Sequence, residues 1–222
     1  MWPFRKKQTL EESGFFRGFT DWHCHILPGV DDGVQTMDEA LQILAEYERL
    51  GVKEVWFTPH IMEDMPNTPQ HLRERFAELQ AAYQGKVTLN LASENMLDNL
   101  FEERLNKNDL LPIGKDGRRL LVETSYFNPP MGLQNILLRI KAKGYIPILA
   151  HPERYQYMGE SDYQQMKSMN VLFQLNQFSL LGLYGKEVQK QAKLLKKQGM
   201  YEYIGTDLHH IKTLRNALNF RI

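Results

Sequence analysis

The feature that most constrains the fold is a regular alternation of strand-like and helix-like segments along the chain. Apolar, β-rich runs predict strands at residues 19–27, 52–58, 86–93, 119–125, 145–150, 171–176 and 201–206. Strict βα alternation predicts a parallel sheet, because each helix must return the chain to the same end of the next strand. Seven such units on 222 residues favour a barrel. An open doubly wound sheet is the alternative, but the sequence has no Gly-x-Gly-x-x-Gly fingerprint.

The helical segments between these strands carry recognisable boundary signals. Thr36 with Glu39 three residues later is a capping-box pattern, and Gly51 follows the apolar periodicity as a C-terminal cap. Thr68-Pro69 predicts the start of a second helix, which ends near Gly85. Further helices are expected over residues 97–105, 133–140, 162–169 and 186–198, and from about residue 211.

Composition bounds the class of protein. The 27 basic and 27 acidic residues give a formal net charge of +0, so we expect no nucleic-acid partner. One cysteine excludes an internal disulfide and fits a reducing, cytoplasmic compartment. No apolar run approaches the roughly 20 residues of a transmembrane helix.

The first 18 residues are expected to form a flexible N-terminal arm, and residues 19–222 a single domain. Arg5, Lys6 and Lys7 are basic, but no apolar region follows them, so we do not expect a signal peptide. Three basic residues are few for binding an anionic membrane surface.

Potential metal ligands gather at the predicted strand ends. His23 and His25 alternate on the first strand, so both side chains point to one side of it and can grip one divalent ion. In a parallel barrel, the loops that follow the strands form one rim. Seven further ligand-type residues fall at that rim: Asp32, His60, Glu94, Glu123, His151, Asp207 and His209.

Each of these residues also has an ordinary structural interpretation. A histidine at a strand end is often a hydrogen-bonded core residue, Glu94 and Glu123 can be caps, and Asp32 before Gly33 can be a turn residue. Nine ligand-type side chains at one rim are harder to explain, since burying so many charges without metals is costly. We therefore predict a multi-metal site.

The types of ligand atom restrict which metals are expected to bind. Nitrogen and carboxylate ligands without thiolate indicate manganese, iron or zinc. Strand alternation turns Cys24 away from His23 and His25, so we interpret it as a small buried residue rather than a ligand or nucleophile. His71 is interpreted as a surface group, and His210 as a bystander at least as readily as a site residue.

Arg154 follows the fifth strand in the run His151-Pro152-Glu153-Arg154-Tyr155. Its planar guanidinium offers a fork of donors to a phosphoryl group. A surface ion pair with Glu153 is the alternative. Because Arg154 is expected to lie beside the metals, recognition of phosphate is favoured over the ion pair.

These residues together resemble a known superfamily. The motifs are Asp21-x-His23-x-His25, the loop Leu27-Pro28-Gly29-Val30-Asp31-Asp32-Gly33, Thr58-Pro59-His60, Ala150 to Tyr155, and Gly205-Thr206-Asp207-Leu208-His209. They are similar to the polymerase and histidinol phosphatase (PHP) superfamily, and most of all to its bacterial capsular-polysaccharide tyrosine-protein phosphatases. The segments Phe173–Asn176 and Ser179–Gly185 resemble the same group, so the likeness runs from about residue 19 to 209.

The resemblance implies a distorted TIM-like (β/α)₇ barrel that holds three metal ions, often manganese. It implies one ion on His23, His25 and Asp207, shared through Glu94, and a second on Glu94, Glu123 and His151. A third ion would lie on Asp32, His60 and His209. It also implies that Arg154 contacts the phosphoryl group. The family has a further arginine after the Asp-x-His motif. Arg215 is the candidate here, but its spacing from Asp207 and His209 differs slightly from the family pattern.

The implied activity is hydrolysis of phosphotyrosine by a metal-activated hydroxide, with Arg154 and His209 as catalytic residues. The implied substrate is the C-terminal tail of a membrane-associated tyrosine kinase that controls polysaccharide export. The alternatives are a small-molecule phosphatase of the histidinol-phosphate type and a metal-binding scaffold without catalysis. An amidohydrolase is disfavoured, because those barrels commonly bridge metals with a modified lysine where this chain has Glu94.

Overall fold

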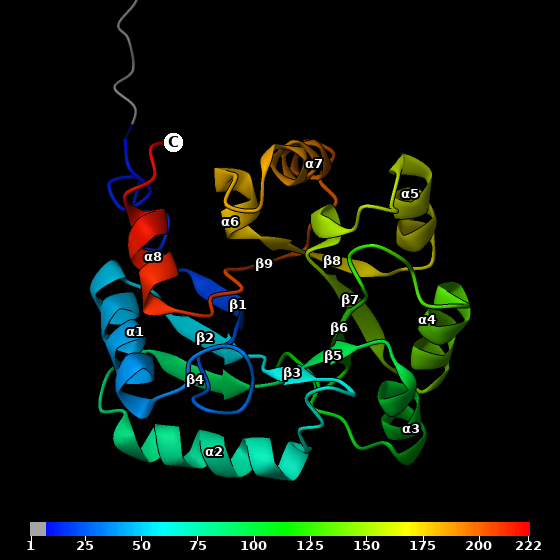
Figure 1. The fold of residues 1–222 in the computed structure, drawn as a ribbon, viewed down its shortest axis with the longest axis horizontal. Helices are drawn as coiled ribbons and strands as arrows, with labels where there is room; N and C mark the ends of the chain where they lie inside the picture. The colour runs from blue at the N-terminus through cyan, green and yellow to red at the C-terminus, as the bar shows by residue number, and fades with distance from the viewer. Residues whose placement is uncertain (1–7) are drawn as a thin grey trace, which may run out of the picture.

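Parallel strands form the centre of the structure, a computed structural model that describes residues 8–222 (Figure 1). One sheet has the order β1 (Thr20–Cys24), β2 (Glu54–Phe57) and β4 (Thr88–Leu91). The second sheet has the order β3 (His60–Ile61), β5 (Glu94–Met96), β6 (Arg119–Glu123), β7 (Ile146–Ala150), β8 (Leu172–Asn176) and β9 (Tyr203–Gly205). Every pair of neighbouring strands is parallel, as the βα alternation predicted.

Two short strands, β3 and β5, lie outside the seven predicted runs. β2 stops before Pro59, which has no N–H to donate, and the chain resumes as β3 at His60. The run predicted at residues 86–93 contains β4, and β5 begins just after it at Glu94. Hydrogen bonds from the Ala92 N–H to the Phe57 carbonyl and from the Glu94 N–H to the Pro59 carbonyl keep these segments side by side. The described residues therefore form nine strands in a curled sheet.

The first and last strands also meet. Cys24 and Leu208 form a parallel bridge, and the Asp207 N–H donates to the His23 carbonyl over 2.8 Å. This junction brings residues from opposite ends of the chain into one rim, so the motifs around His23 and Asp207 share a site.

Helices surround the curled sheet (Figure 1). They are α1 (Met37–Leu50), α2 (Pro69–Ala82), α3 (Asn99–Lys107), α4 (Leu133–Ala142), α5 (Glu160–Ser168), α7 (Lys186–Lys197) and α8 (Ile211–Leu218). The Thr36 side chain accepts from the Glu39 N–H, and Gly51 has the left-handed φ of 84° expected of a C-terminal cap. A short helix α6 (Gln177–Leu181) and the 3₁₀ turn η1 (Pro152–Arg154) were not predicted.

Residues 8–18, which we placed in the N-terminal arm, pack against the domain. Leu10 and Phe16 are buried, Phe16 lies against Tyr47, and Thr9 forms an antiparallel bridge with Arg221. The apolar side chains at 10 and 16 bury themselves in the core that α1 also lines, so the folded unit begins before residue 19. Residues 1–7 lie outside the described part of the chain. Within residues 8–222, no helix has the length and apolar character that crossing a membrane requires.

Candidate metal centre

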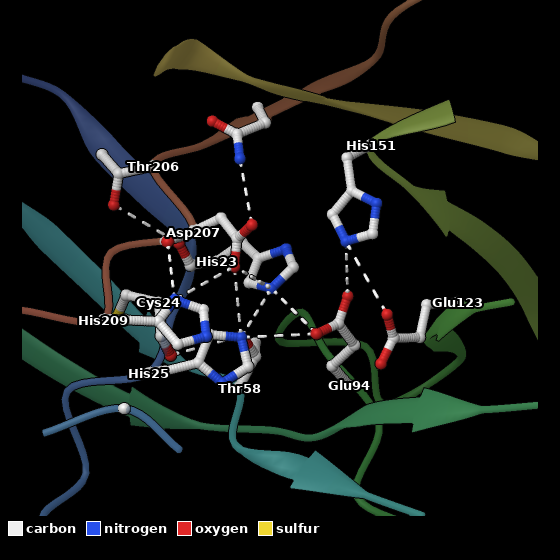
Figure 2. Close-up of polar contacts among 12 residues, drawn as sticks. His23, Cys24, His25, Thr58, Glu94, Glu123, His151, Thr206, Asp207 and His209 are labelled. Atoms are coloured by element: carbon white, nitrogen blue, oxygen red, sulfur yellow. Dashed lines mark hydrogen bonds and ion pairs between the residues drawn. The ribbon is translucent and has the colours of Figure 1, made fainter. Parts of the chain in front are cut away.

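The nine predicted ligands come together at one end of the strands. Figure 2 shows most of them: His23, His25, Glu94, Glu123, His151, Asp207 and His209. His23 lies in β1 and Glu123 ends β6, while His60 and Glu94 open β3 and β5. The other five lie in the segments that follow strands: His25, Asp32, His151, Asp207 and His209. Their ligand-type atoms form four overlapping groups in which all atoms lie within 4.8 Å of one another. One group contains His23, His25 and Asp207; a second, His23, Glu94 and His151; a third, His60, Glu94 and Glu123; and a fourth, His25, Asp32, His60 and His209.

Hydrogen bonds at the far side of two imidazoles determine which nitrogen is left for a ligand. The His23 Nδ1 lies 2.6 Å from the Gln174 Oε1, and the His25 Nδ1 lies 2.8 Å from the Asp31 Oδ2. Both oxygens are acceptors, so each Nδ1 carries the proton and each Nε2 presents a lone pair. The two Nε2 atoms face each other at 3.0 Å.

Carboxylate oxygens complete this arrangement of acceptors. The Glu94 Oε2 lies 3.2 Å from the His23 Nε2 and 3.3 Å from the His25 Nε2. The Asp207 Oδ1 lies 3.4 Å and 3.3 Å from the same two atoms. Both carboxylates thus lie against the paired imidazoles, and His23, His25 and Asp207 form one group whose ligand-type atoms suit a divalent cation.

Buried atoms without hydrogen bonds give an independent test of the fit. The Glu94 Oε2, the Glu123 Oε1 and the His60 Nδ1 are buried and lack a hydrogen-bond partner among the described residues. The His60 Nδ1 lies only 2.9 Å from the Glu123 Oε1, yet the two do not align as donor and acceptor. Leaving such groups unsatisfied is costly, and a cation between them removes the cost. The residues fit a metal centre.

Electrostatics within the cluster point the same way. Burial favours the neutral form of Glu94 and Asp207, but the adjacent imidazoles hold the pKa of both carboxyls well below the usual range. Burial disfavours the charged form of His25, yet Asp31, Asp207 and Glu94 raise its pKa well above the ordinary value. The ionised carboxylates are therefore stabilised by nearby positive charge. In the metal-free protein this charge comes from protons on the histidines, and in the metal-bound protein it would come from a divalent ion.

The backbone at two of the ligand-type residues is strained. His151 has φ of 35° and Asp207 has φ of 52°, in the left-handed region that non-glycine residues rarely adopt. Such conformations cost on the order of 1–3 kcal/mol and persist where surrounding structure enforces them. Here they turn two side chains into the cluster close to strand ends, since His151 directly follows β7 and Asp207 is the second residue after β9.

Two glycines allow the chain to approach the paired histidines closely. A Cβ on Gly33 would lie 2.1 Å from the His25 carbonyl oxygen, and one on Gly205 would lie 2.3 Å from the His23 Cβ. Beside them, the buried Asp21 carboxylate accepts from the Tyr47 hydroxyl and from the Thr206 N–H and hydroxyl. Asp21 of the opening motif is therefore a structural link between β1, α1 and the segment that follows β9.

Arg154 lies at the edge of the cluster. Its Nη1 donates to the Asp207 Oδ2 over 2.6 Å, and its side chain is 17% exposed. Its guanidinium lies over the rings of Tyr126 and Tyr184, with the guanidinium carbon 4.5 Å and 4.3 Å from the two centroids. The Asn176 side chain donates to both the Tyr184 hydroxyl and the Asp207 Oδ2. Arg154 is therefore held in place rather than paired with Glu153 at the surface.

The remaining candidates lie outside the cluster. Cys24 is buried, with its thiol 3.5 Å from the Trp56 carbonyl, and His71 is exposed on α2, both as predicted. His210 is exposed and lies 4.0 Å from Glu39, and Arg215 is exposed on α8.

Four contributors were not predicted as site residues. They are Asp31, Gln174, Tyr126 and Tyr184. All four lie in segments that follow or end strands, and Asp31, Gln174 and Tyr184 also fall within the motifs that resemble the family.

Comparison with known proteins places this arrangement in a family. Residues 19–219 match the family model described as capsular polysaccharide synthesis, CpsB/CapC. The chain belongs to this family. Tyrosine-protein phosphatase YwqE of Bacillus subtilis is 27% identical over 199 residues, covering 87% of this chain and 78% of YwqE. Tyrosine-protein phosphatase CpsB of Streptococcus pneumoniae is 28% identical over 208 residues, covering 86% of this chain and 83% of CpsB.

A solved structure agrees with these relatives. A crystal structure from a study of YwqE and CpsB, described as unique metal-dependent tyrosine phosphatases, superimposes with a TM-score of 0.81 and 25% identity. The match covers 90% of this chain and 85% of the other. The fold and the family thus agree with the metal-binding character of the rim.

Proposed function

We propose that the protein is a metal-dependent protein-tyrosine phosphatase. The observation that carries the proposal is the convergence of nine buried or rim-placed ligand-type side chains beside Arg154. Membership of the CpsB/CapC family, whose named relatives are tyrosine-protein phosphatases, supports it. We also infer that the curled sheet is a distorted (β/α)₇ barrel, since the Cys24–Leu208 bridge joins the first strand to the segment after the last.

We assign three divalent ions to the centre, with manganese preferred and iron or zinc as alternatives. His23, His25 and Asp207 would hold one ion with Glu94. Glu94, Glu123 and His151 would hold a second, since the His151 Nε2 lies 3.0 Å from the Glu94 Oε1 and 3.9 Å from the Glu123 Oε2. Asp32, His60 and His209 would hold the third. Bound divalent ions supply Lewis-acid stabilisation of phosphoryl oxygens and acidify water at neutral pH.

Arg154 and His209 would serve the reaction directly. The guanidinium presents a planar fork to phosphoryl oxygens, and the two tyrosine rings keep that fork oriented. The His209 Nδ1 donates to the Asp207 carbonyl over 2.9 Å, so its Nε2 is the atom left for a ligand or a proton. A tyrosine leaving group has a pKa near 10, so it departs more readily than an aliphatic alkoxide and demands less from a general acid.

We propose that the substrate is a phosphotyrosine protein, the C-terminal tail of a membrane-associated tyrosine kinase, dephosphorylated in the cytoplasm. The family's role in capsular polysaccharide synthesis supports this choice.

Phosphate release from a phosphotyrosine peptide, with and without added Mn²⁺, tests the proposal. We expect release that requires the metal and stops with a chelator, and much slower turnover of histidinol phosphate. Preferential turnover of histidinol phosphate would instead identify a small-molecule phosphatase. Stoichiometric metal binding without any phosphatase activity would identify a scaffold.

A further inference from the structure

Helix α7 carries a stripe of lysines on its outer face. Its twelve residues include five lysines and one glutamate. Four of the lysines recur at spacings of four, three and four residues, which places them on one helical face about 16 Å long. We call this set the basic stripe: Lys186, Lys190, Lys193 and Lys197. All four are exposed, while Ala192 and Leu195 on the opposite face are buried.

The charge of the basic stripe is not neutralised locally. Across residues 8–222, no carboxylate oxygen lies within 4 Å of a lysine amine of α7, whereas Lys107, Lys115 and Lys167 each have a carboxylate partner. Like charges four residues apart destabilise a helix by a few tenths of a kcal/mol each. The whole chain is neutral, so this face is a local concentration of positive charge.

An apolar groove of about 830 Å³ borders the stripe. Leu180, Phe220 and Ile222 contribute apolar side chains to it, and Lys193 and Lys196 line its edge. Leu194 of α7, Phe220 and Ile222 are large apolar residues with 41%, 37% and 49% of their surface exposed. Figure 1 shows α7 at the outer edge of the molecule, on the same side of the view as the C-terminus.

We propose that this face docks on the surface of an anionic phospholipid bilayer. Lysine amines on flexible stems attract headgroup phosphates, and exposed aliphatic and aromatic groups beside them enter the interfacial layer. A lysine amine is a point charge and, unlike arginine, has no planar fork of donors that must match a fixed partner. It therefore suits phosphates on laterally mobile lipid headgroups better than a carboxylate held rigidly on a folded protein. The described chain begins at Gln8, whose carbonyl accepts from the Ile222 N–H, and Arg5, Lys6 and Lys7 immediately precede it in the sequence.

Docking through this face is independent of the proposed phosphatase reaction. The stripe and the groove contain none of the nine candidate ligands, Arg154 or its two tyrosines. Changes in the stripe should therefore alter where the protein binds and not its turnover of a soluble phosphotyrosine peptide.

Vesicle co-sedimentation of the full chain tests the proposal. The probes are vesicles of phosphatidylcholine alone and vesicles with about one-third phosphatidylglycerol. The quadruple variant K186Q/K190Q/K193Q/K197Q removes the stripe, and K53Q/K86Q/K107Q/K115Q removes the same charge from four exposed lysines elsewhere. A third variant replaces the four stripe lysines with arginine and keeps the charge.

We expect binding to the anionic vesicles only, weakened by salt, and weakened at least roughly tenfold in the stripe variant. The control and the arginine variant should bind nearly as the parent chain does, and all should hydrolyse the soluble peptide equally. Equal loss in the stripe variant and its control would show only a non-specific charge effect and overturn the proposal. Stripe-dependent binding to polyglutamate without binding to the vesicles would assign the face to an acidic polypeptide and also overturn it.

Discussion

At the scale of single residues, the candidate centre depends on side chains that are not candidate ligands but hydrogen-bond to them. Asp31 accepts from the His25 Nδ1 and also from the His60 N–H, so one carboxylate orients two ligand-bearing segments. Outer hydrogen bonds of this kind fix the tautomer and direction of a ligand imidazole.

Replacing Asp31 with asparagine should weaken metal binding about 10- to 100-fold while leaving the fold intact. The amide lacks the negative charge that keeps the His25 Nδ1 protonated and its Nε2 available. Metal titration by calorimetry measures the effect, with Asp109→Asn as a control at an exposed aspartate. Unchanged affinity in Asp31→Asn would mean that His25 does not need this partner.

Arg154→Gln should lower phosphotyrosine turnover by about 10²–10³-fold with metal content unchanged. Asp207 would keep the Asn176 amide as a donor to its Oδ2, so the ligand-type carboxylate retains a hydrogen bond. Steady-state kinetics and metal analysis together check this, with the exposed Arg118→Gln as the control. Near-normal turnover in Arg154→Gln would remove the guanidinium from the mechanism.

At the scale of the elements, the junction of β1 and β9 sets the position of the histidine pair. Gly205 needs no left-handed φ, so its constraint is purely the lack of space for a Cβ beside His23. Gly159 at the start of α5 offers a contrast, since a Cβ there would meet its nearest neighbour at 3.7 Å.

Gly205→Ala should therefore lower the free energy of unfolding by about 1–3 kcal/mol and reduce metal content, because overpacking separates the two strands. Gly159→Ala should change both quantities little. Denaturant titration and metal analysis of the purified variants provide the comparison. Equal stability of the two variants would show that the strands move apart without cost.

The sequence was most informative where periodicity and strand ends coincide. Parallel strands share one carboxyl edge, so the order of strands along the chain is enough to predict that His23, Glu94 and Asp207 lie together. The short strands β3 and β5 were not predicted, because runs of two or three residues are too short to show the alternating pattern of a strand. The packing of Leu10 and Phe16 was missed because two apolar residues outside a periodic segment carry no local signal.

Partners of the ligands were harder to predict than the ligands themselves. Gln174 and Asp31 act through hydrogen bonds whose other member lies on a different strand or loop. The orientation of Tyr126 and Tyr184 around Arg154 likewise depends on tertiary packing and not on spacing in the chain.

At the scale of the whole molecule, metal binding and stability should be linked through pH. In the metal-free protein, carboxylates raise the pKa of His23 and His25 against the opposing effect of burial. A raised folded-state pKa contributes stability that is fully present below the unfolded value of about 6.5 and is lost as pH rises through the folded-state value. Protonated imidazoles thus compensate the buried carboxylates at low pH, and neutral ones do not.

A chelator should therefore lower the Tm, and the decrease should be larger near pH 8.5 than near pH 6. Metal ions also compete with protons for the same histidine nitrogens and so bind more tightly at the higher pH. This effect too makes the decrease in Tm on chelation larger near pH 8.5. Thermal denaturation of metal-loaded and chelated protein at the two pH values measures it. A larger decrease at the lower pH would contradict the assignment of the histidines as ligands.

Anomalous diffraction from manganese-loaded crystals is the most direct test of the central claim, that the nine side chains form one metal centre. We expect anomalous peaks within coordination distance of His23, His25 and Asp207, of Glu94, Glu123 and His151, and of Asp32, His60 and His209. Peaks absent from this rim, or confined to other surface acids, would contradict the account.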